Sequence, residues 1–266
     1  MRKPIVAGAF YEGERASLER QLNDCFAGIK REENEDVIGA VVPHAGYMYS
    51  GSVAANAYAK LPRADIFVIL GPNHQGIGSL VAVSKDTWAT PLGEVDIDEA
   101  FVDALPRRII ALDENAHRYE HSIEVQLPFL QFLFHRNFSF VPICMSLSDE
   151  DTAREVGEDL ADTIAKTDKK VVMLASSDFT HYEPEEVARD KDEYVVGAIK
   201  KLDISKFYNR VYARNATVCG VGPIAAVMHA AKKLGAKEGK LASYATSGDT
   251  TGDRSSVVGY AAITIS

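Results

Sequence analysis

The 266-residue chain contains no apolar run that approaches the roughly 20 residues needed to cross a bilayer. It also lacks the apolar core of a secretory leader, because the N-terminal stretch "MRKPIVAGAFYEGERASLERQ" becomes charged too early. Basic runs are absent and the formal net charge is −9, which speaks against a surface for nucleic acid or anionic membrane. We therefore expect a cytoplasmic protein that binds neither nucleic acid nor membrane.

Cysteine is scarce, and several catalytic signatures are missing. Cys25, Cys144 and Cys219 are odd in number and far apart, so we expect no disulfide framework, and a functional cysteine would be a thiol or a ligand. The chain has no P-loop, no G-x-G-x-x-G, no G-x-S-x-G and no H-E-x-x-H. Nucleotide-binding, nucleophile-elbow and zincin interpretations therefore have no support.

What the chain does have is an alternation of continuous apolar runs with helical patterns. Runs such as "VIGAVVPH", "ADIFVILGPNHQG" and "KKVVMLASSD" predict strands that are buried on both faces of a sheet. Helical segments between them predict βαβ crossovers. We therefore predict a single α/β domain over residues 1–266, with a central mostly parallel or mixed sheet and helices on both faces.

Polar side chains follow three of these predicted strands. His44 ends the first run, His74 ends the second, and Asp178 and His181 follow a third. In open α/β sheets, ligands bind outside the carboxyl ends of the strands. One such histidine alone would be a ring hydrogen-bonded at a strand end. Two of them in Gly/Pro-rich turns favour a shared site, and imidazole is the commonest protein ligand for metals.

Two further pairs are candidates for catalysis. Asp178 and His181 form Asp-x-x-His, a spacing that would let the carboxylate orient the imidazole. A helix N-cap at Asp178 beside an exposed His181 is the competing interpretation. His121 and Glu124 stand three residues apart and would share a helical face, which suits a metal site or proton relay. A capping arrangement is the alternative for the second pair, since Ser122 and Glu124 lie at a predicted helix start. We take all four as candidate catalytic residues.

Cys219 lies in "RNATVCGVGPIAAV", just before a glycine-rich turn and a predicted helix. A helix N-terminus stabilises a thiolate, the form that binds metal or attacks an electrophile. A small buried hydrophobe is the alternative, and it fits Cys144 well. We expect His117 at the surface, and His135 and His229 in structural settings.

Six motifs occur in a fixed order, namely "PHAGYMYSG", "GPNH", "TPLGEV", "EHSIEVQLPFL", "SSDFTHY" and "CGVGP". This set resembles the Memo family over nearly the whole chain. The family is similar to class III extradiol dioxygenases, which use non-haem iron. The resemblance therefore implies an α/β domain with a central sheet, in agreement with the pattern of apolar runs.

The resemblance also implies a metal site. The histidines of the family's "PHAGY" and "GP-x-H" motifs fall on His44 and His74, and the cysteine of its "CG" motif falls on Cys219. Thiolate in place of the dioxygenase carboxylate shifts the preference toward copper(I) or zinc, while still allowing iron. We expect iron(II) or copper, with zinc as a further option. Ring cleavage is not inherited from the fold alone.

The motif resemblance places Asp178, His181 and His121 around this metal. The leading hypothesis is a metal-binding, redox-active protein that acts on a small-molecule or peptide substrate. The resemblance implies AMMECR1-like and radical-SAM proteins as partners. One alternative is a metal-free hydrolase with Cys219 as nucleophile, His181 as base and Asp178 as orienter. The other is a non-catalytic module that binds peptides or phosphopeptides.

Overall fold

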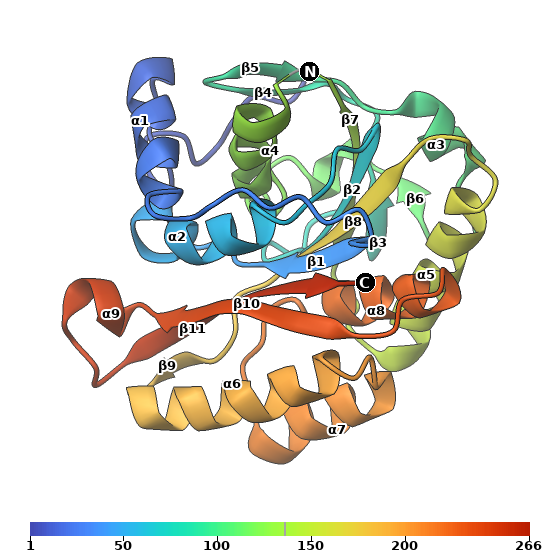
Figure 1. Cartoon of the computed structure of the whole chain (residues 1–266). Coiled ribbons are helices and arrows are strands. Elements are labelled where there is room, and N and C mark those ends of the chain that lie inside the picture. The colour runs from blue at the N-terminus through green and yellow to red at the C-terminus, as the bar shows by residue number, and fades with distance from the viewer. Residues whose placement is uncertain (136) are drawn as a thin grey trace.

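A mixed β-sheet runs through the centre of the computed structural model, which describes residues 1–135 and 137–266 (Figure 1). Within these residues nine strands form the sheet, in the order β10-β11-β1-β8-β2-β7-β3-β6, with β9 paired to β11. The strands are β1 (Gly39–Val42), β2 (Ile66–Pro72), β3 (Val81–Val83), β6 (Ala111–Leu112), β7 (Ser139–Met145), β8 (Val171–Ser176), β9 (His181–Glu183), β10 (Gly239–Thr246) and β11 (Val257–Ile265). A separate hairpin joins β4 (Trp88–Thr90) and β5 (Gly93–Val95).

The middle of the sheet is parallel and its flanks are antiparallel. Strands β1, β8, β2 and β7 run in the same direction, whereas β11 pairs with β1, and β3 with β7, in the opposite sense. Every residue of β1, β2 and β8 is buried, which explains why their sequences are continuous rather than alternating. The predicted α/β fold with a mostly parallel or mixed central sheet is confirmed.

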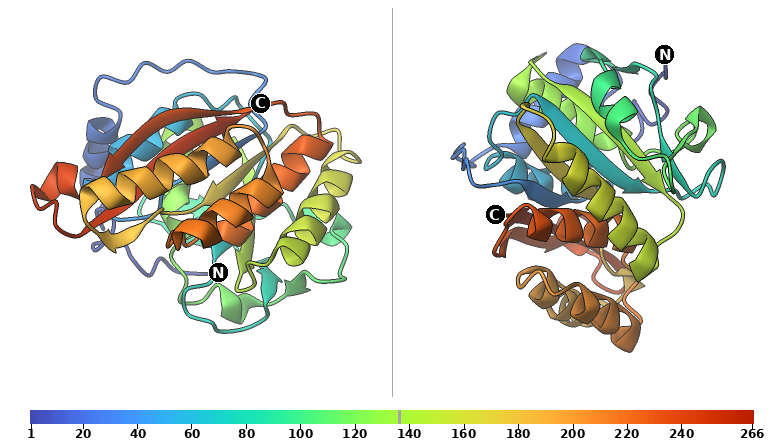
Figure 2. Two further views of the ribbon diagram at one scale, coloured as in Figure 1. Left: turned by 90° about the horizontal axis from the view of Figure 1, so that it is seen from below. Right: turned by 90° about the vertical axis from the view of Figure 1, so that its right-hand side faces the viewer.

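Helices cover both faces of the sheet (Figure 1). They are α1 (Arg15–Cys25), α2 (Tyr47–Tyr58), α3 (Glu99–Ala104), α4 (Leu127–Phe134), α5 (Glu150–Ile164), α6 (Glu185–Ile199), α7 (Ile204–Arg214), α8 (Val221–Lys233) and α9 (Gly248–Thr251), with short 3₁₀ turns η1 (Glu114–Ala116) and η2 (Glu124–Gln126). Helices α1, α2 and α4 lie on one side, and α6 and α7 form the outermost layer of the other, as the side view in Figure 2 shows. In the described part of the chain, no helix is both long and apolar enough to span a membrane.

The carboxyl ends of the central strands create the place where the predicted residues meet. Strand β8 lies between β1 and β2 and is parallel to both, with Val42 opposite Ser176 and Leu70 opposite Ala175. The turns after all three strands therefore open at the same edge of the sheet. His44, His74 and Asp178 belong to these turns.

Candidate metal centre

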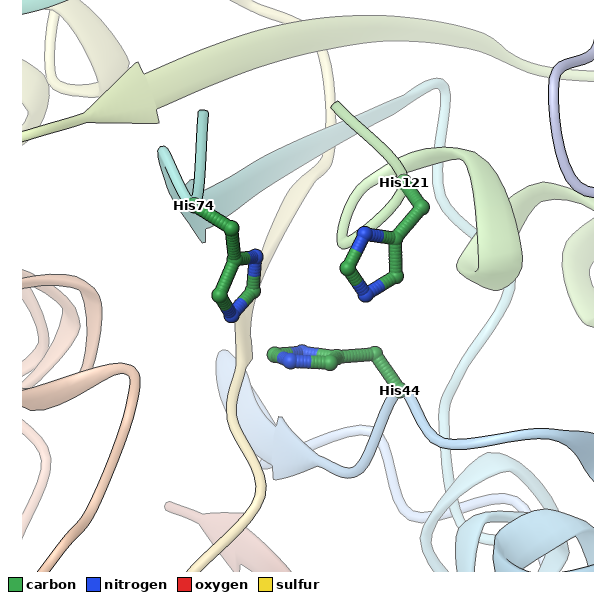
Figure 3. A group of neighbouring side chains, drawn as sticks. All are labelled: His44, His74 and His121. Carbon is green, nitrogen blue, oxygen red and sulfur yellow. The ribbon is translucent and has the colours of Figure 1, made fainter. Parts of the chain in front are cut away.

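Three histidine side chains converge at this edge. His44 follows β1, His74 follows β2, and His121 lies in the segment just before η2. Each ring offers one possible ligand nitrogen, and these three atoms all lie within 4.8 Å of one another. Figure 3 shows one nitrogen of each ring pointing into the space between them. The three side chains could hold a metal ion, since neutral imidazole is a common metal ligand.

Burial keeps two of the three rings uncharged. Burial lowers the pKa of His44 well below its ordinary value, and the neighbouring His121 and His74 lower it further. Burial also lowers the pKa of His121, against the opposing charge of Glu120. Both rings therefore remain neutral and keep a lone pair available. The side chain of His74 is 31% exposed, so the cluster is reached by solvent from that side.

Glu120 is a site residue that sequence reasoning missed. Its buried carboxylate accepts hydrogen bonds from the backbone amide of His74 (2.6 Å) and from the amides of His121 (2.9 Å) and Ser122 (2.8 Å). The Nδ1 atoms of His74 and His121 lie 3.0 and 3.4 Å from its Oε1. Burial raises the pKa of Glu120, but the hydrogen bond and charge of His74, the amide of Ser122 and the charge of His121 together outweigh it and lower the pKa to about 2. Its position directly before His121 is the signal that could have identified it.

The same contact raises the pKa of His74. Burial lowers that pKa, but the hydrogen bond and the charge of Glu120 have the larger combined effect. With Nδ1 of His74 donating to the carboxylate, Nε2 is the ring atom left for a ligand. The carboxylate thus orients the ring as outer partners of metal-binding histidines commonly do.

Cys219 lies beside the three histidines. Its Sγ is 3.3 Å from Nε2 of His44 and accepts a hydrogen bond from the amide of Asp178 (3.1 Å). Helix α8 begins just after it with Gly220 as N-cap, where a Cβ would lie 2.5 Å from Cβ of Ser177. Only glycine therefore fits the turn that brings the sulfur to the edge of the sheet.

The protonation of Cys219 differs from the expectation of a thiolate stabilised by the helix. Burial raises the pKa of the thiol, and the nearby charge of Asp178 raises it further. The thiol is therefore protonated unless a cation beside the sulfur opposes this effect. His121, rather than Cys219, completes the trio of ligand atoms within 4.8 Å, and the role of Cys219 as a ligand stays a prediction.

Asp178 and His181 both reach the site but do not form the predicted pair. Oδ1 of Asp178 accepts a hydrogen bond from the backbone amide of His44 (2.8 Å). Nδ1 of His181 lies 2.8 Å from the carbonyl of Thr217, whose hydroxyl accepts from the His181 amide. Thr217, rather than Asp178, therefore orients the ring. Burial raises the pKa of Asp178 to about 6, although its hydrogen bond to His44 and the charge of His181 oppose the shift.

Glu124 does not share a helical face with His121, since the 3₁₀ turn begins only at Glu124 itself. Its fully buried carboxylate accepts hydrogen bonds from Arg2 (2.7 Å), the hydroxyl of Tyr11 (2.8 Å) and the amide of Ile5 (3.0 Å). All of these donors belong to the N-terminal segment. The predicted role of Glu124 in the site is therefore corrected to that of an anchor for this segment.

His117 is buried, so its predicted surface position is wrong. Its side chain is 1% exposed and its ring centroid lies 5.6 Å from that of Trp88. Its carbonyl accepts a hydrogen bond from Nε of Arg2 (2.7 Å). Burial and the nearby charge of Arg2 lower the pKa of His117 to about 4. No local pattern marks this contact, because Arg2 lies 115 residues away.

Known proteins resemble this chain over its whole length. A family model described as "Memo-like protein" matches residues 2–264. A "MEMO1 family protein" of Methanosarcina mazei is 55% identical over 265 residues, covering 100% of this chain and 99% of the relative. Another from Archaeoglobus fulgidus is 51% identical over 263 residues, covering 99% and 98%. Among solved structures, uncharacterized protein JW3007 from Escherichia coli K12 has a TM-score of 0.56 at 14% identity, covering 86% of this chain and 99% of that one. That structural likeness shows the fold alone.

Proposed function

The chain belongs to the Memo family, and we propose that it is a metal-binding protein in which His44, His74 and His121, with Cys219 beside them, hold a redox-active transition metal. The observation that carries this proposal is the convergence of three imidazole nitrogens within 4.8 Å of one another. The Memo family match spans all four positions, but it names no metal.

The donor set fits such a metal. Imidazole nitrogen together with thiolate sulfur suits iron, copper and zinc better than magnesium or calcium, which prefer oxygen. Two of the rings have a hydrogen-bonding partner on Nδ1, namely Ser176 for His44 and Glu120 for His74, and Nδ1 of His121 lies 3.4 Å from the same Glu120 carboxylate. Histidines that ligate metals commonly use the second nitrogen in this way, which fixes the ring and leaves Nε2 for the ion.

A bound iron or copper ion would supply one-electron oxidation and reduction. Around it, we assign to His181 the transfer of protons to or from a substrate, with Thr217 holding its ring. Asp178 holds the backbone of His44 in place. A small-molecule or peptide substrate would approach from the side of His74, which is the most exposed of the three histidines. AMMECR1-like and radical-SAM proteins remain the proposed partners.

A second candidate function rests on the pair formed by Cys219 and His44. A sulfur 3.3 Å from an imidazole nitrogen is the arrangement of a cysteine nucleophile and its base. His44 would then be the base in place of the predicted His181. This hydrolase candidate ranks second, because burial raises the pKa of the thiol and because it gives His74 and His121 no role.

Metal content by mass spectrometry tests the proposal. We would purify wild type, His44→Ala, His121→Ala and Cys219→Ser without chelator and without a nickel column. We expect near-stoichiometric iron or copper in wild type and its loss in the His44 and His121 variants. His135→Asn is the matched control, because His135 is exposed and does not belong to the cluster.

Because a metal can be lost during purification, anaerobic titration with Fe(II), Cu(I) and Zn(II) tests whether the metal-free protein binds an added ion. Wild type that contains no metal and binds none of the three ions tightly would refute the metal proposal. Rapid modification of Cys219 by iodoacetamide, slowed in His44→Ala, would then support the hydrolase candidate instead.

A further inference from the structure

We infer that Ser176 is a positioning residue that fixes the ring tautomer of His44, so that its Nε2 lone pair points into the histidine cluster. This inference rests on the proposed metal function, which it deepens. Ser176 is the last residue of β8 and is completely buried. Its hydroxyl contacts three groups from separate parts of the chain, and their chemistry leaves one arrangement of protons.

The first of these groups is the side-chain amide of Gln126, which is also fully buried. Its Nε2 lies 2.9 Å from the carbonyl of Pro43, and its Oε1 lies 2.7 Å from the hydroxyl of Tyr58. A carbonyl can only accept, so the nitrogen must be the end that faces Pro43. The same nitrogen lies 2.8 Å from Oγ of Ser176 and therefore donates to it.

The second group is the backbone carbonyl of Ser122, 2.6 Å from Oγ of Ser176. This oxygen also can only accept, so it needs the single hydroxyl proton of Ser176. The third group is Nδ1 of His44, at 2.9 Å. The hydroxyl proton of Ser176 is donated to the carbonyl of Ser122, and one lone pair of its oxygen accepts from Gln126. The remaining lone pair of the Ser176 oxygen must therefore accept a hydrogen bond from the N–H at Nδ1 of His44.

Neutral His44 consequently carries its proton on Nδ1, and Nε2 holds the lone pair. Nε2 is the atom that lies 3.3 Å from Sγ of Cys219, on the side of the cluster. The other tautomer would turn an N–H toward the space where a metal would bind. It would also set the Nδ1 lone pair against a serine oxygen whose only proton is engaged. Metal ligation by Nε2 therefore needs no prior tautomer change.

Nuclear magnetic resonance of the metal-free protein labelled with ¹⁵N in histidine measures this tautomer directly. The His44 signals are assigned by their disappearance in His44→Gln. In wild type we expect a pyrrole-type Nδ1 and a pyridine-type Nε2 for His44. A wild-type spectrum with the proton on Nε2 would overturn the inference, whatever the variants do.

Ser176→Ala removes the acceptor, and we expect a mixture of the two His44 tautomers together with metal affinity lowered roughly 10- to 100-fold. The matched control is Ser84→Ala, another fully buried serine, whose hydroxyl donates to Glu114. We expect that control to leave the His44 spectrum and the affinity unchanged. Unchanged tautomer and affinity in folded Ser176→Ala would refute the role of Ser176.

The two proposals fail separately. A wild-type protein with the Nδ1–H tautomer that binds no Fe(II), Cu(I) or Zn(II) would uphold the structural inference and reject the metal function. Should Ser176→Ala not fold, the wild-type spectrum still decides between the tautomers, because it requires no substitution.

Discussion

Replacing Glu124 with glutamine should destabilise the fold strongly while sparing the metal site. The Glu124 side chain is 0% exposed and that of Arg2 is 6% exposed, so their 2.7 Å ion pair is desolvated. Removing one partner of a buried pair commonly costs about 3–5 kcal/mol, because the other charge is left uncompensated. Arg2 would keep the carbonyls of His117 and Glu120 as acceptors. We therefore expect Glu124→Gln to lower the free energy of unfolding by about 3 kcal/mol, the lower end of that range.

For a chain of this size, such a loss lowers the melting temperature by roughly 6–12 °C. Circular dichroism during heating and urea unfolding at 25 °C measure it. Glu19→Gln is the matched control, since Glu19 pairs with Arg15 at the surface, with side chains 47% and 55% exposed. That substitution should change stability by less than about 0.5 kcal/mol. Arg2→Met in the Glu124→Gln background should recover part of the loss, because the unpaired charge is then gone.

Two results would refute this reasoning. The first is a melting temperature for Glu124→Gln that falls no further than that of Glu19→Gln, since the carboxylate would then not anchor the N-terminal segment. The second is a normally stable Glu124→Gln protein that has lost its metal. That outcome would return Glu124 to the catalytic role that the spacing from His121 first suggested.

Three further predictions concern the histidine cluster, a buried histidine and a close glycine contact. Glu120→Gln should weaken metal binding roughly 10- to 100-fold, measured by competition with a chelator, because the ring of His74 loses its charged acceptor and the nearby ring of His121 loses the negative charge beside it. His117 has a pKa of about 4 when folded and about 6.5 when unfolded, so stability should be full above pH 6.5 and fall by about 3 kcal/mol toward pH 4. Urea unfolding across that pH range should show that the free energy of unfolding of His117→Phe depends less on pH than that of wild type. Gly259→Ala would push a methyl group into the buried carboxylate of Asp192 and should cost about 1–3 kcal/mol in the same assay. Gly197→Ala, which meets only the end of an arginine side chain, should cost much less.

The parallel centre of the sheet could be predicted because its signal is local. Strands buried on both faces must be apolar at every position, and the sequences before His44, His74 and Asp178 have this property. The shared edge then follows from a general rule for parallel strands. Neither step needs knowledge of a distant contact.

The partners of these residues could not be predicted, because they depend on distant contacts. Thr217 reaches His181 across 36 positions, and Ser176 reaches His44 across 132. Neither a threonine nor a serine carries a sequence signal for such a contact. The position of Cys219 before a helix could also be predicted from the sequence. Its partial burial, which raises the pKa of the thiol, could not.

The error at Glu124 came from continuing a helical period too far toward the N-terminus. Helix α4 begins at Leu127, with Pro128 in its first turn. Proline is favoured there, whereas inside a helix its ring would clash with the carbonyl four residues earlier, which is that of Glu124. A regular α-helix from His121 through Pro128 would therefore be kinked or broken at that carbonyl. His121 precedes the 3₁₀ turn, and the carboxylate of Glu124 is bonded to the N-terminal segment instead of the histidine cluster.

Two buried carboxylates four positions apart take different roles because their donors differ. Glu120 accepts from the backbone amides of His74 and His121 and from the ring nitrogen of His74, so its charge acts on the site. Glu124 accepts from Arg2 and other groups of the N-terminal segment, so its charge acts on the fold. Arg2 joins the two, since it also donates to the carbonyl of Glu120. The segment that carries His121 is thus held from both sides, and metal affinity and stability should respond separately to the loss of each carboxylate.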